Sequence, residues 1–306
     1  KNTSLREFLG GARGVVPMAS PLYVVHTGSH CFDAQFHPKE PVIVAATIEG
    51  LLELHRHDGS SGVKYGQISA HEESCRTARF LGKSRENRIA SASADETAAV
   101  SDLEKEKRIW KRKLKAGGNS LLPLSYNTFA VGDDEGIISL FDVRKKSHVH
   151  EFTENEDFIS DMVAGEDGNM LCASSGDGTL AVYDLRKGSL FAMSDFQEDE
   201  FLSLTIVKQG TKVVCGAQSG AVAVFSWGDF GDHKDRIRGH PLSVDAMTKF
   251  SEDAILTGSS DGNVRVVGVY HEKHGSRVVN LVGEHGSLPL ERLAMSPDEG
   301  SFLSVS

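Results

Sequence analysis

Acidic residues in glycine-containing turns are the residues of this chain whose types could most readily support chemistry. In the stretch SSGDGTLAVYDLRKG (174–188), Asp177 stands between two glycines. A carboxylate in such a turn could ligate a cation, and a glycine-rich loop can expose backbone N–H groups to a phosphate. However, no second carboxylate stands at the spacing of a calcium-binding loop. We therefore expect Asp177 to form a turn rather than to catalyse a reaction or bind a metal.

No other pattern in the sequence predicts an active site or a cofactor site. The nucleophile elbow, the zinc-protease helix, the Walker loop and the dinucleotide-binding fingerprint are all absent. Three pairs of histidines lie close in sequence: His55 and His57, His148 and His150, and His271 and His274. A zinc site needs three or four converging ligands, and no third ligand is adjacent to these pairs. We interpret the histidines as solvated side chains at sheet edges, and we predict no enzyme activity, no cofactor and no metal.

The composition is that of an ordinary globular protein. The 306 residues are 39% hydrophobic and 25% charged, with a formal net charge of −10 at pH 7. No apolar stretch reaches the roughly 18 residues that a membrane helix requires, and no targeting signal is visible. The negative charge disfavours a nucleic-acid footprint over the whole molecule, but it allows a local basic patch. Four widely spaced cysteines without a Cys-x-x-Cys pair predict buried free thiols.

The turn around Asp177 is one member of a repeat. Equivalent turn residues recur at spacings of 46, 40, 42, 42 and 42 positions: Glu49, Asp95, Glu135, Asp177, Ser219 and Asp261. Each turn follows an apolar run such as PVIVAAT (41–47) and precedes an alternating run such as LAVYD (180–184), which together predict a β-hairpin. One further strand on either side gives about four strands in about 40–45 residues, the period of a β-propeller blade. The sequence therefore predicts an all-β, seven-bladed β-propeller.

A single domain accounts for this repeat. We expect residues 1–20 to form an irregular N-terminal segment and residues 21–306 to form one monomeric propeller. The stretch FLSVS (302–306) ends just before a seventh turn would occur, so the last blade is incomplete in this sequence. Residues 22–27 (LYVVHT) precede the first repeat, and we expect them to add an outer strand to that last blade. This strand would close the ring between the two ends of the chain.

The repeats resemble WD repeats. Gly239 and His240 match the Gly-His pair of that family, with partial matches at 70–71 and 284–285. The terminal Trp-Asp pair is replaced by SD, FD, YD and FS, so no repeat carries the tryptophan. The resemblance implies that the turn aspartate, the histidine and a strand serine or threonine form a buried network, which must be fully hydrogen-bonded to be tolerated. The implied members are Asp95, His71 and Ser91 or Ser93 in the second repeat, Asp261, His240 and Thr257 or Ser259 in the sixth, and Asp177 in the fourth.

A basic strip interrupts this acidic sequence at residues 105–115 (KEKRIWKRKLK). Two interpretations remain open. Lysines on the outer strand of a blade would discourage pairing with other sheet edges. Alternatively, the strip would contact an RNA backbone weakly and in a salt-dependent manner, with the tryptophan stacked on a base. The residues concerned are Lys107, Arg108, Trp110, Lys111, Arg112 and Lys113.

Two neighbouring repeats end in Asp-x-Arg, at Asp142 and Arg144 (FDVRK) and at Asp184 and Arg186 (YDLRK). This ending resembles the W-D-x-R box of substrate receptors for cullin–RING ubiquitin ligases, in which the arginine points towards the ligase adaptor. Arginine suits such a contact because its guanidinium presents a rigid fork of donors. The alternative is that each arginine caps a strand end or pairs with a nearby aspartate. Adaptor docking is therefore a hypothesis for these four residues.

Longer stretches extend the resemblance to one family. GDDEGIISLFDVRK (132–145), SSGDGTLAVYDLR (174–186) and KVVCGAQSGAVAVFSWGDFGDHKDRI (212–237) occur in order and look like the WD repeat-containing protein 55 family. The insertion SWGDFGDHKDR is the most specific piece, because generic repeats do not need Trp-Gly at that position. The resemblance covers about residues 31–306.

The family resemblance implies a function that composition and spacing do not. It implies a non-catalytic scaffold of the nucleus and nucleolus that acts in rRNA processing and ribosome biogenesis, with pre-ribosomal assembly factors as protein partners. It also implies an alternative, a substrate receptor of a cullin-4-type ubiquitin ligase that would use the two Asp-x-Arg ends. No membrane partner is expected. Members usually carry a lysine-rich tail after the last blade, and the given sequence ends before such a tail.

Overall fold

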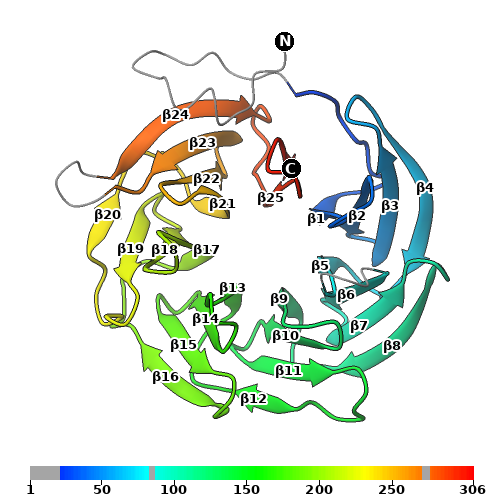
Figure 1. Cartoon of the computed structure of the whole chain (residues 1–306), viewed down its shortest axis with the longest axis horizontal. Helices are drawn as coiled ribbons and strands as arrows, with labels where there is room; N and C mark the ends of the chain where they lie inside the picture. Colours follow the sequence, from blue (N-terminus) through cyan, green and yellow to red (C-terminus); the bar gives the residue numbers. More distant parts are fainter. Residues whose placement is uncertain (1–20, 83–86, 271–275) are drawn as a thin grey trace.

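The computed structural model describes residues 21–82, 87–270 and 276–306. These residues form strands, turns and loops but no helix, so they contain no helix that could cross a lipid bilayer. The sheets are arranged in a ring, with one strand of each sheet near the centre and, in six of the sheets, a fourth strand at the rim (Figure 1). The prediction of an all-β propeller is therefore confirmed.

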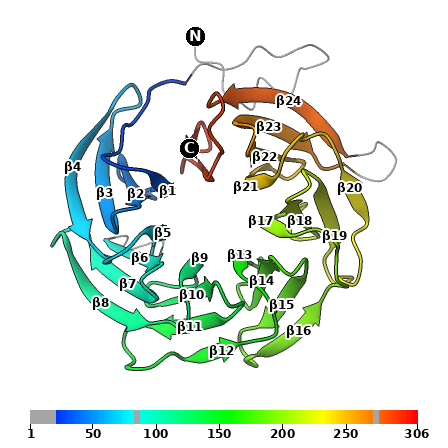
Figure 2. The same cartoon turned by 180° about the vertical axis from the view of Figure 1, so that it is seen from behind.

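Six sheets are four-stranded blades in which consecutive strands pair in an antiparallel manner. In chain order, the blades are β1 (Cys31–Phe36), β2 (Val42–Thr47), β3 (Leu51–His57) and β4 (Gly62–Ser69); β5 (Cys75–Phe80), β6 (Arg88–Ser93), β7 (Thr97–Asp102) and β8 (Lys107–Lys113); β9 (Gly118–Pro123), β10 (Thr128–Asp133), β11 (Ile138–Asp142) and β12 (His150–Phe152); β13 (Ile159–Ala164), β14 (Met170–Ser175), β15 (Leu180–Asp184) and β16 (Ser189–Met193); β17 (Phe201–Val207), β18 (Lys212–Ala217), β19 (Val222–Ser226) and β20 (Asp235–Ile237); and β21 (Val244–Ser251), β22 (Ala254–Ser259), β23 (Asn263–Gly268) and β24 (Arg277–Glu284). A seventh sheet contains two strands, β25 (Arg292–Met295) and β26 (Phe302–Val305). Seen from behind, the first strand of each blade again lies nearest the centre (Figure 2).

The antiparallel strand order gives the ring two different faces. The turns between the second and third strands, and the connections between blades, lie on one face, here the upper face. The turns between the first and second strands, and between the third and fourth, lie on the opposite, lower face. The recurring turns from Glu49 to Asp261 therefore lie on the upper face, whereas Arg144 and Arg186 lie on the lower face.

Glycine is required at five upper-face turns because the backbone of the next connection comes very close. The glycines have φ values between 75° and 82°, a region that favours glycine: Gly50, Gly136, Gly178, Gly220 and Gly262. A Cβ atom on Gly178 would lie 2.2 Å from the backbone oxygen of Gln197. Each of these turns is therefore packed directly against the connection that leads into the next blade.

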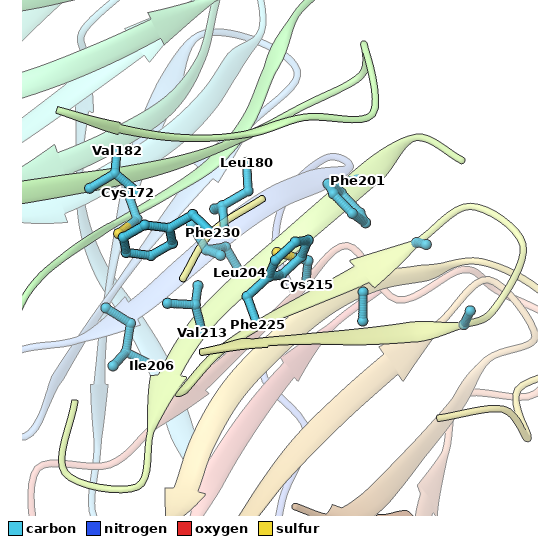
Figure 3. Packing of buried hydrophobic residues seen from close by; sticks show 13 residues of the cluster. Cys172, Leu180, Val182, Phe201, Leu204, Ile206, Val213, Cys215, Phe225 and Phe230 are labelled. Atoms are coloured by element: carbon cyan, nitrogen blue, oxygen red, sulfur yellow. The ribbon is translucent and has the colours of Figure 1, made fainter. Parts of the chain in front are cut away.

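The hydrophobic core of the described chain is divided into seven clusters, and each cluster spans two neighbouring blades. Between the fourth and fifth blades, Cys172 and Val182 share one cluster with Phe225 (Figure 3). The cluster that completes the ring joins Phe36 of the first blade to Val305 of the seventh sheet. The inward side chains of each sheet are thus buried against the next sheet, as in stacked β-sheets generally.

The four cysteines are buried and free, as the sequence predicts. Burial raises the pKa of the Cys31 and Cys172 thiols to about 12, so both stay protonated near neutral pH. These thiols belong to the clusters between blades rather than to a reactive site.

The closure of the ring differs from the expectation for residues 22–27. These residues form no strand, and the seventh sheet contains only β25 and β26. The segment lies instead against the first blade, where the ring of Tyr23 stacks 6.3 Å from that of His57. The backbone N–H of Gly28 donates to the Glu53 carboxylate at 3.2 Å. The physical reason is that an outer strand must pair with a third strand, and the sequence to Ser306 contains only the first two strands of this blade.

Candidate functional site

The second blade contains a continuous polar network around His71. The Nδ1 atom of His71 lies 3.2 Å from Oδ1 of Asp95 and 3.0 Å from Oγ1 of Thr97. Its Nε2 atom lies 2.8 Å from Oγ of Ser91. The backbone N–H of Glu72 also donates to Asp95, at 3.1 Å. Burial lowers the pKa of His71 to about 4, so the ring is neutral at pH 7 and acts as a hydrogen-bonding member of the blade.

The sixth blade uses its histidine differently from the expectation. Nε2 of His240 lies 2.9 Å from Oγ1 of Thr257, and Nδ1 lies 3.3 Å from the carbonyl oxygen of Gly220. Asp261 does not bond to this histidine, because Arg265 donates to it through two guanidinium nitrogens, with Nη1 at 2.9 Å from Oδ1. A charged guanidinium binds a carboxylate more strongly than a neutral imidazole does. The expected Asp261–His240 contact is therefore replaced by an Asp261–Arg265 ion pair.

In the fourth blade, Asp177 holds its own turn and the preceding connection together. Its carboxylate accepts the backbone N–H of Thr179 at 2.8 Å, the hydroxyl of Thr179 at 2.6 Å and the backbone N–H of Glu156 at 2.8 Å. Asn155 stands where the second blade has its histidine, and its Nδ2 donates to Oγ1 of Thr179 at 3.1 Å. The hydroxyl of Tyr183 donates to Asn155 at 2.8 Å. Sequence reasoning missed Asn155, because it lies in an acidic stretch that reads as a solvated loop.

The tryptophan of the basic strand β8 is directed into the protein. Its ring packs edge-on against Phe129 and Phe141 of the third blade, at centroid distances of 5.7 and 5.5 Å. The guanidinium of Arg112 lies 5.0 Å from the centroid of the Trp110 ring. The indole is thus enclosed between two blades and a cation. The expected stacking of Trp110 on an RNA base does not fit this arrangement.

Several basic side chains of β8 are already engaged within the protein. Arg108 donates to the backbone carbonyl of Ala70, in the connection between the first and second blades, at 2.7 Å, and Lys111 donates to Asp95 at 3.2 Å. Lys107 and Lys113 are exposed. Lys113 also pairs with Glu96 at 3.3 Å across the solvent-exposed edge, so the strand combines edge lysines with contacts inside the protein.

The two Asp-x-Arg ends have different local geometry on the lower face. Nε and Nη2 of Arg144 donate to the two carboxylate oxygens of Asp142, at 2.9 and 2.6 Å. These hydrogen bonds lower the pKa of Asp142 to about 2. Asp184 instead accepts the backbone N–H groups of Arg186 and Lys187, at 2.9 and 3.1 Å. Within the described chain, the guanidinium of Arg186 is exposed and makes no hydrogen bond or ion pair.

The histidine pairs do not form a metal site in the part of the chain that is described. His55 is buried rather than solvated, and its Nε2 lies 3.1 Å from the Glu53 carboxylate. Lys64 donates to the same carboxylate at 2.6 Å. The pair at 271 and 274 lies outside the described residues. Among described residues, no group of three or more histidine, cysteine, aspartate or glutamate side chains could hold a metal ion.

A β-bulge in the innermost strand of each complete blade inserts one extra residue near the upper face. The extra residues all line a cavity of about 340 Å³ at the centre of the ring: Phe32, Arg76, Asn119, Ser160, Leu202 and Asp245. The recurrence of the bulge means that every complete blade contributes one side chain to the mouth of the channel. Sequence reasoning did not find this site, because the extra residue is of a different type in each of the six blades and so leaves no repeated pattern.

Buried ion pairs connect blades below this mouth. Arg79 of β5 donates to Asp33 of β1, and the backbone N–H of Ala78 donates to the same carboxylate at 3.0 Å. Arg292 of β25 lies 3.6 Å from Asp33 and 3.6 Å from Asp161 of β13. Burial disfavours the charge on Arg292, but the two aspartates outweigh burial and raise its pKa. These charges hold the ring together across the channel.

Four-stranded blades, recurring upper-face turns and histidine–hydroxyl contacts together define a WD-repeat β-propeller. Among solved structures, the chain is similar to the "Structure of U3-55K", with a TM-score of 0.77 over 92% of this chain and 89% of that chain. The sequence identity is 13%, so this likeness concerns the fold.

Sequence comparison identifies the family. A family model described as WDR55 matches residues 23–306. WD repeat-containing protein 55 of Arabidopsis thaliana is 38% identical over 279 residues, which cover 90% of this chain and 77% of the plant protein. WD repeat-containing protein JIP5 of Cryptococcus neoformans is 31% identical over 304 residues, covering 93% of this chain and 79% of the fungal protein. The chain belongs to the WDR55 family, and the resemblance seen in its sequence is confirmed.

Proposed function

We propose that this WD-repeat protein is a non-catalytic scaffold that binds protein partners in pre-ribosomal particles of the nucleus and nucleolus. The observation that carries the proposal is membership of the WDR55 family over residues 23–306. The repeat residues also support a binding role. The histidine and aspartate side chains that could perform chemistry are engaged in hydrogen bonds inside the blades, as at His71 and Asp177.

A rigid ring suits such a role because its loops are presented on a fixed frame. Loops held by a rigid scaffold commonly carry recognition, and a propeller offers two faces and a rim. Fold alone does not assign a partner, so the proposal must be tested on the protein itself.

The test is affinity purification of the chain from nuclear extract, with and without RNase, followed by mass spectrometry of the bound proteins. We expect ribosome-assembly factors to co-purify in both samples, because the proposed contacts are between proteins. Loss of these factors after RNase would indicate that RNA, rather than this chain, holds them. Their absence from both samples would contradict the scaffold proposal.

Reception of substrates for a cullin-4-type ubiquitin ligase is the second candidate. It is favoured by one observation, the exposed guanidinium of Arg186, which makes no hydrogen bond or ion pair within the described chain. Arg144 lies at the equivalent position of the neighbouring blade but is held by Asp142. Docking of a ligase adaptor would use the lower face at these two blades.

The same purification tests this candidate with two matched double variants. Arg144→Ala/Arg186→Ala removes the hypothetical docking residues. Lys145→Ala/Lys187→Ala removes the same charge from the same two turns. Adaptor binding that is lost only in the arginine variant would make ligase reception the primary function. Equal binding of the adaptor by all forms would remove the Asp-x-Arg ends from consideration.

A further inference from the structure

The ionisable side chains at the mouth of the central channel are unevenly paired. Each arginine that lines the cavity has a carboxylate partner: Arg76 with Asp134, Arg79 with Asp33, and Arg292 with Asp33 and Asp161. Two lining carboxylates, Asp245 and Glu291, make no ion pair with a basic side chain of the described residues. The mouth therefore has an excess of negative charge that the protein does not compensate.

These two carboxylates lie next to each other on the sixth and seventh sheets. Asp245 is the bulge residue of β21, and its Oδ2 accepts the hydroxyls of Ser243 and Ser260, at 3.1 and 2.6 Å. Glu291 directly precedes β25, and its carboxylate makes no hydrogen bond to the described residues. Burial raises the pKa of Glu291; the nearby imidazole of His30 opposes this rise, and the nearby Asp245 adds to it. A bound cation would stabilise the charged form of Glu291 and so oppose the rise in its pKa.

Buried polar atoms inside the same cavity also lack partners. Asp33 is 2% exposed, yet its Oδ1 atom has no hydrogen-bond donor and lies 3.6 Å from Nε of Arg292. Ser120 is 4% exposed, and its hydroxyl has no partner among the described atoms. Both residues line the cavity. Buried polar groups are normally satisfied, so these atoms indicate that a polar guest belongs there.

The walls between the polar groups are apolar. Phe32 and Leu202 reach the mouth from the bulges of β1 and β17, and Phe158 lines it from the connection before β13. An apolar wall with carboxylates on one side matches a side chain that has an aliphatic stem and a cationic end. We propose that the upper mouth of the channel binds an arginine side chain of a basic peptide segment, with Glu291 and Asp245 receiving the guanidinium.

The surrounding upper face fits a basic peptide rather than a free amino acid. Its connections between blades expose acidic side chains on several sides of the channel: Glu72, Glu73, Glu156, Asp157 and Glu198. Such a surface attracts a positively charged segment and steers it towards the mouth. An anionic guest is disfavoured, because all three lining arginines are already neutralised by carboxylates. The site is independent of the proposed scaffold function, since it rests on the described side chains alone.

Binding is tested by fluorescence anisotropy with a short labelled peptide of lysines and alanines around one central arginine. The comparison peptide has citrulline, which keeps the shape but lacks the charge. We expect the chain to bind the arginine peptide in preference to the citrulline peptide. Glu291→Gln and Asp245→Asn should each weaken binding about tenfold, the effect expected for loss of a hydrogen bond between charged groups.

The matched control is Glu104→Gln, which removes one exposed charge from the lower-face turn between β7 and β8, away from the cavity. It should change affinity less than about twofold, because an exposed rim charge contributes little. The proposal would be overturned by equal binding of the two peptides, by wild-type affinity in Glu291→Gln and Asp245→Asn, or by an equal loss in Glu104→Gln. Binding of inorganic tripolyphosphate in place of the peptide, abolished by Arg76→Gln, would also overturn it. Unchanged thermal unfolding of Glu291→Gln shows that its effect is local.

Discussion

Arg292 of the seventh sheet lies with its Nε atom 3.6 Å from Oδ1 of Asp33 in the first blade, across the place where the ring closes. The N-terminal segment adds no strand there, so this ion pair and the apolar cluster around Val305 join the two ends of the ring. Asp33 also accepts the hydroxyl of Thr77 in the second blade at 2.9 Å. One carboxylate therefore links three consecutive sheets.

Removing the charge of Arg292 should destabilise the ring. Arg292→Met keeps much of the side-chain volume but leaves Asp33 and Asp161 without this cation, so we expect a loss of about 3 kcal/mol in the free energy of unfolding. Urea unfolding followed by circular dichroism measures the change. Lys249→Met, which removes a cation paired with exposed Glu252, is the control and should cost less than about 1 kcal/mol. Equal effects of the two substitutions would show that the channel network contributes little.

Acid should weaken the fold through its buried histidines. Burial lowers the pKa of His71 and His240 from the ordinary value of 6.5 to about 4. Below pH 6.5 the histidines become protonated in the unfolded chain, whereas in the folded chain they stay neutral until about pH 4. The free energy of unfolding therefore falls as the pH falls from about 6.5 to about 4. We expect a loss of about 2 kcal/mol for each histidine between about pH 7 and pH 5.

Equilibrium unfolding in urea at a series of pH values checks this dependence. His71→Gln should be less stable than the wild type at neutral pH, because it disturbs the contacts to Asp95 and Ser91. Its stability should nevertheless fall less steeply with acid, since one titrating group is gone. An unchanged slope would mean that His71 does not carry the pH dependence.

Substitution of a turn glycine by alanine should cost much more stability than substitution of other glycines with positive φ. Gly178→Ala places a Cβ atom 2.2 Å from the backbone oxygen of Gln197, so both strain and a clash follow. Gly168 also has a positive φ of 67°, but nothing lies within 4 Å of its Cβ position. We expect Gly168→Ala to cost about 1 kcal/mol and Gly178→Ala about 3 kcal/mol or more. Thermal unfolding of both variants measures the difference, and similar melting temperatures would contradict the close-approach explanation.

Substitutions in β8 should separate its structural role from any contact with RNA. Trp110→Ala removes a ring that packs on Phe129 and Phe141, so we expect a loss of about 3 kcal/mol in stability. Lys107→Ala/Lys113→Ala should leave stability within about 0.5 kcal/mol of the wild type. If β8 contacts single-stranded RNA, this double variant should bind it more weakly and with a smaller salt dependence. RNA binding that is unchanged in the lysine variant would exclude β8 as the contact.

The propeller could be predicted because its signal is local and repeated. An apolar run, a turn and an alternating run recur about every 42 residues, as at Asp177 and Ser219, and each recurrence specifies a hairpin without knowledge of the rest of the chain. The ring closure could not be predicted in the same way. Whether residues 22–27 pair with the last blade depends on a third strand there, and the segment packs on the first blade instead.

The channel site depends on residues that only the ring brings together. The ion pairs of this site join four residues that lie far apart in sequence: Asp33, Arg79, Asp161 and Arg292. They become neighbours because the closed ring places their strands around one channel. A signal existed at three of them, because Asp33, Asp161 and Arg292 are each the single charged residue of a strand, where an isolated charge needs a partner. Arg265, rather than His240, is the partner of Asp261, and this pairing is harder to foresee. It depends on which side chain lies within hydrogen-bonding distance of the Asp261 carboxylate in the folded blade.

Because every apolar cluster belongs to two sheets, no blade can bury its own surface alone. During synthesis from the N-terminus, Phe36 and Ile43 on the first blade stay open to solvent until Val305, near the end of the given sequence, has been made. Each blade leaves one apolar face unburied until the next blade has been synthesised. The growing chain therefore exposes an apolar sheet face at each end of the partial ring, and both faces become buried when β25 and β26 pack against the first and sixth blades.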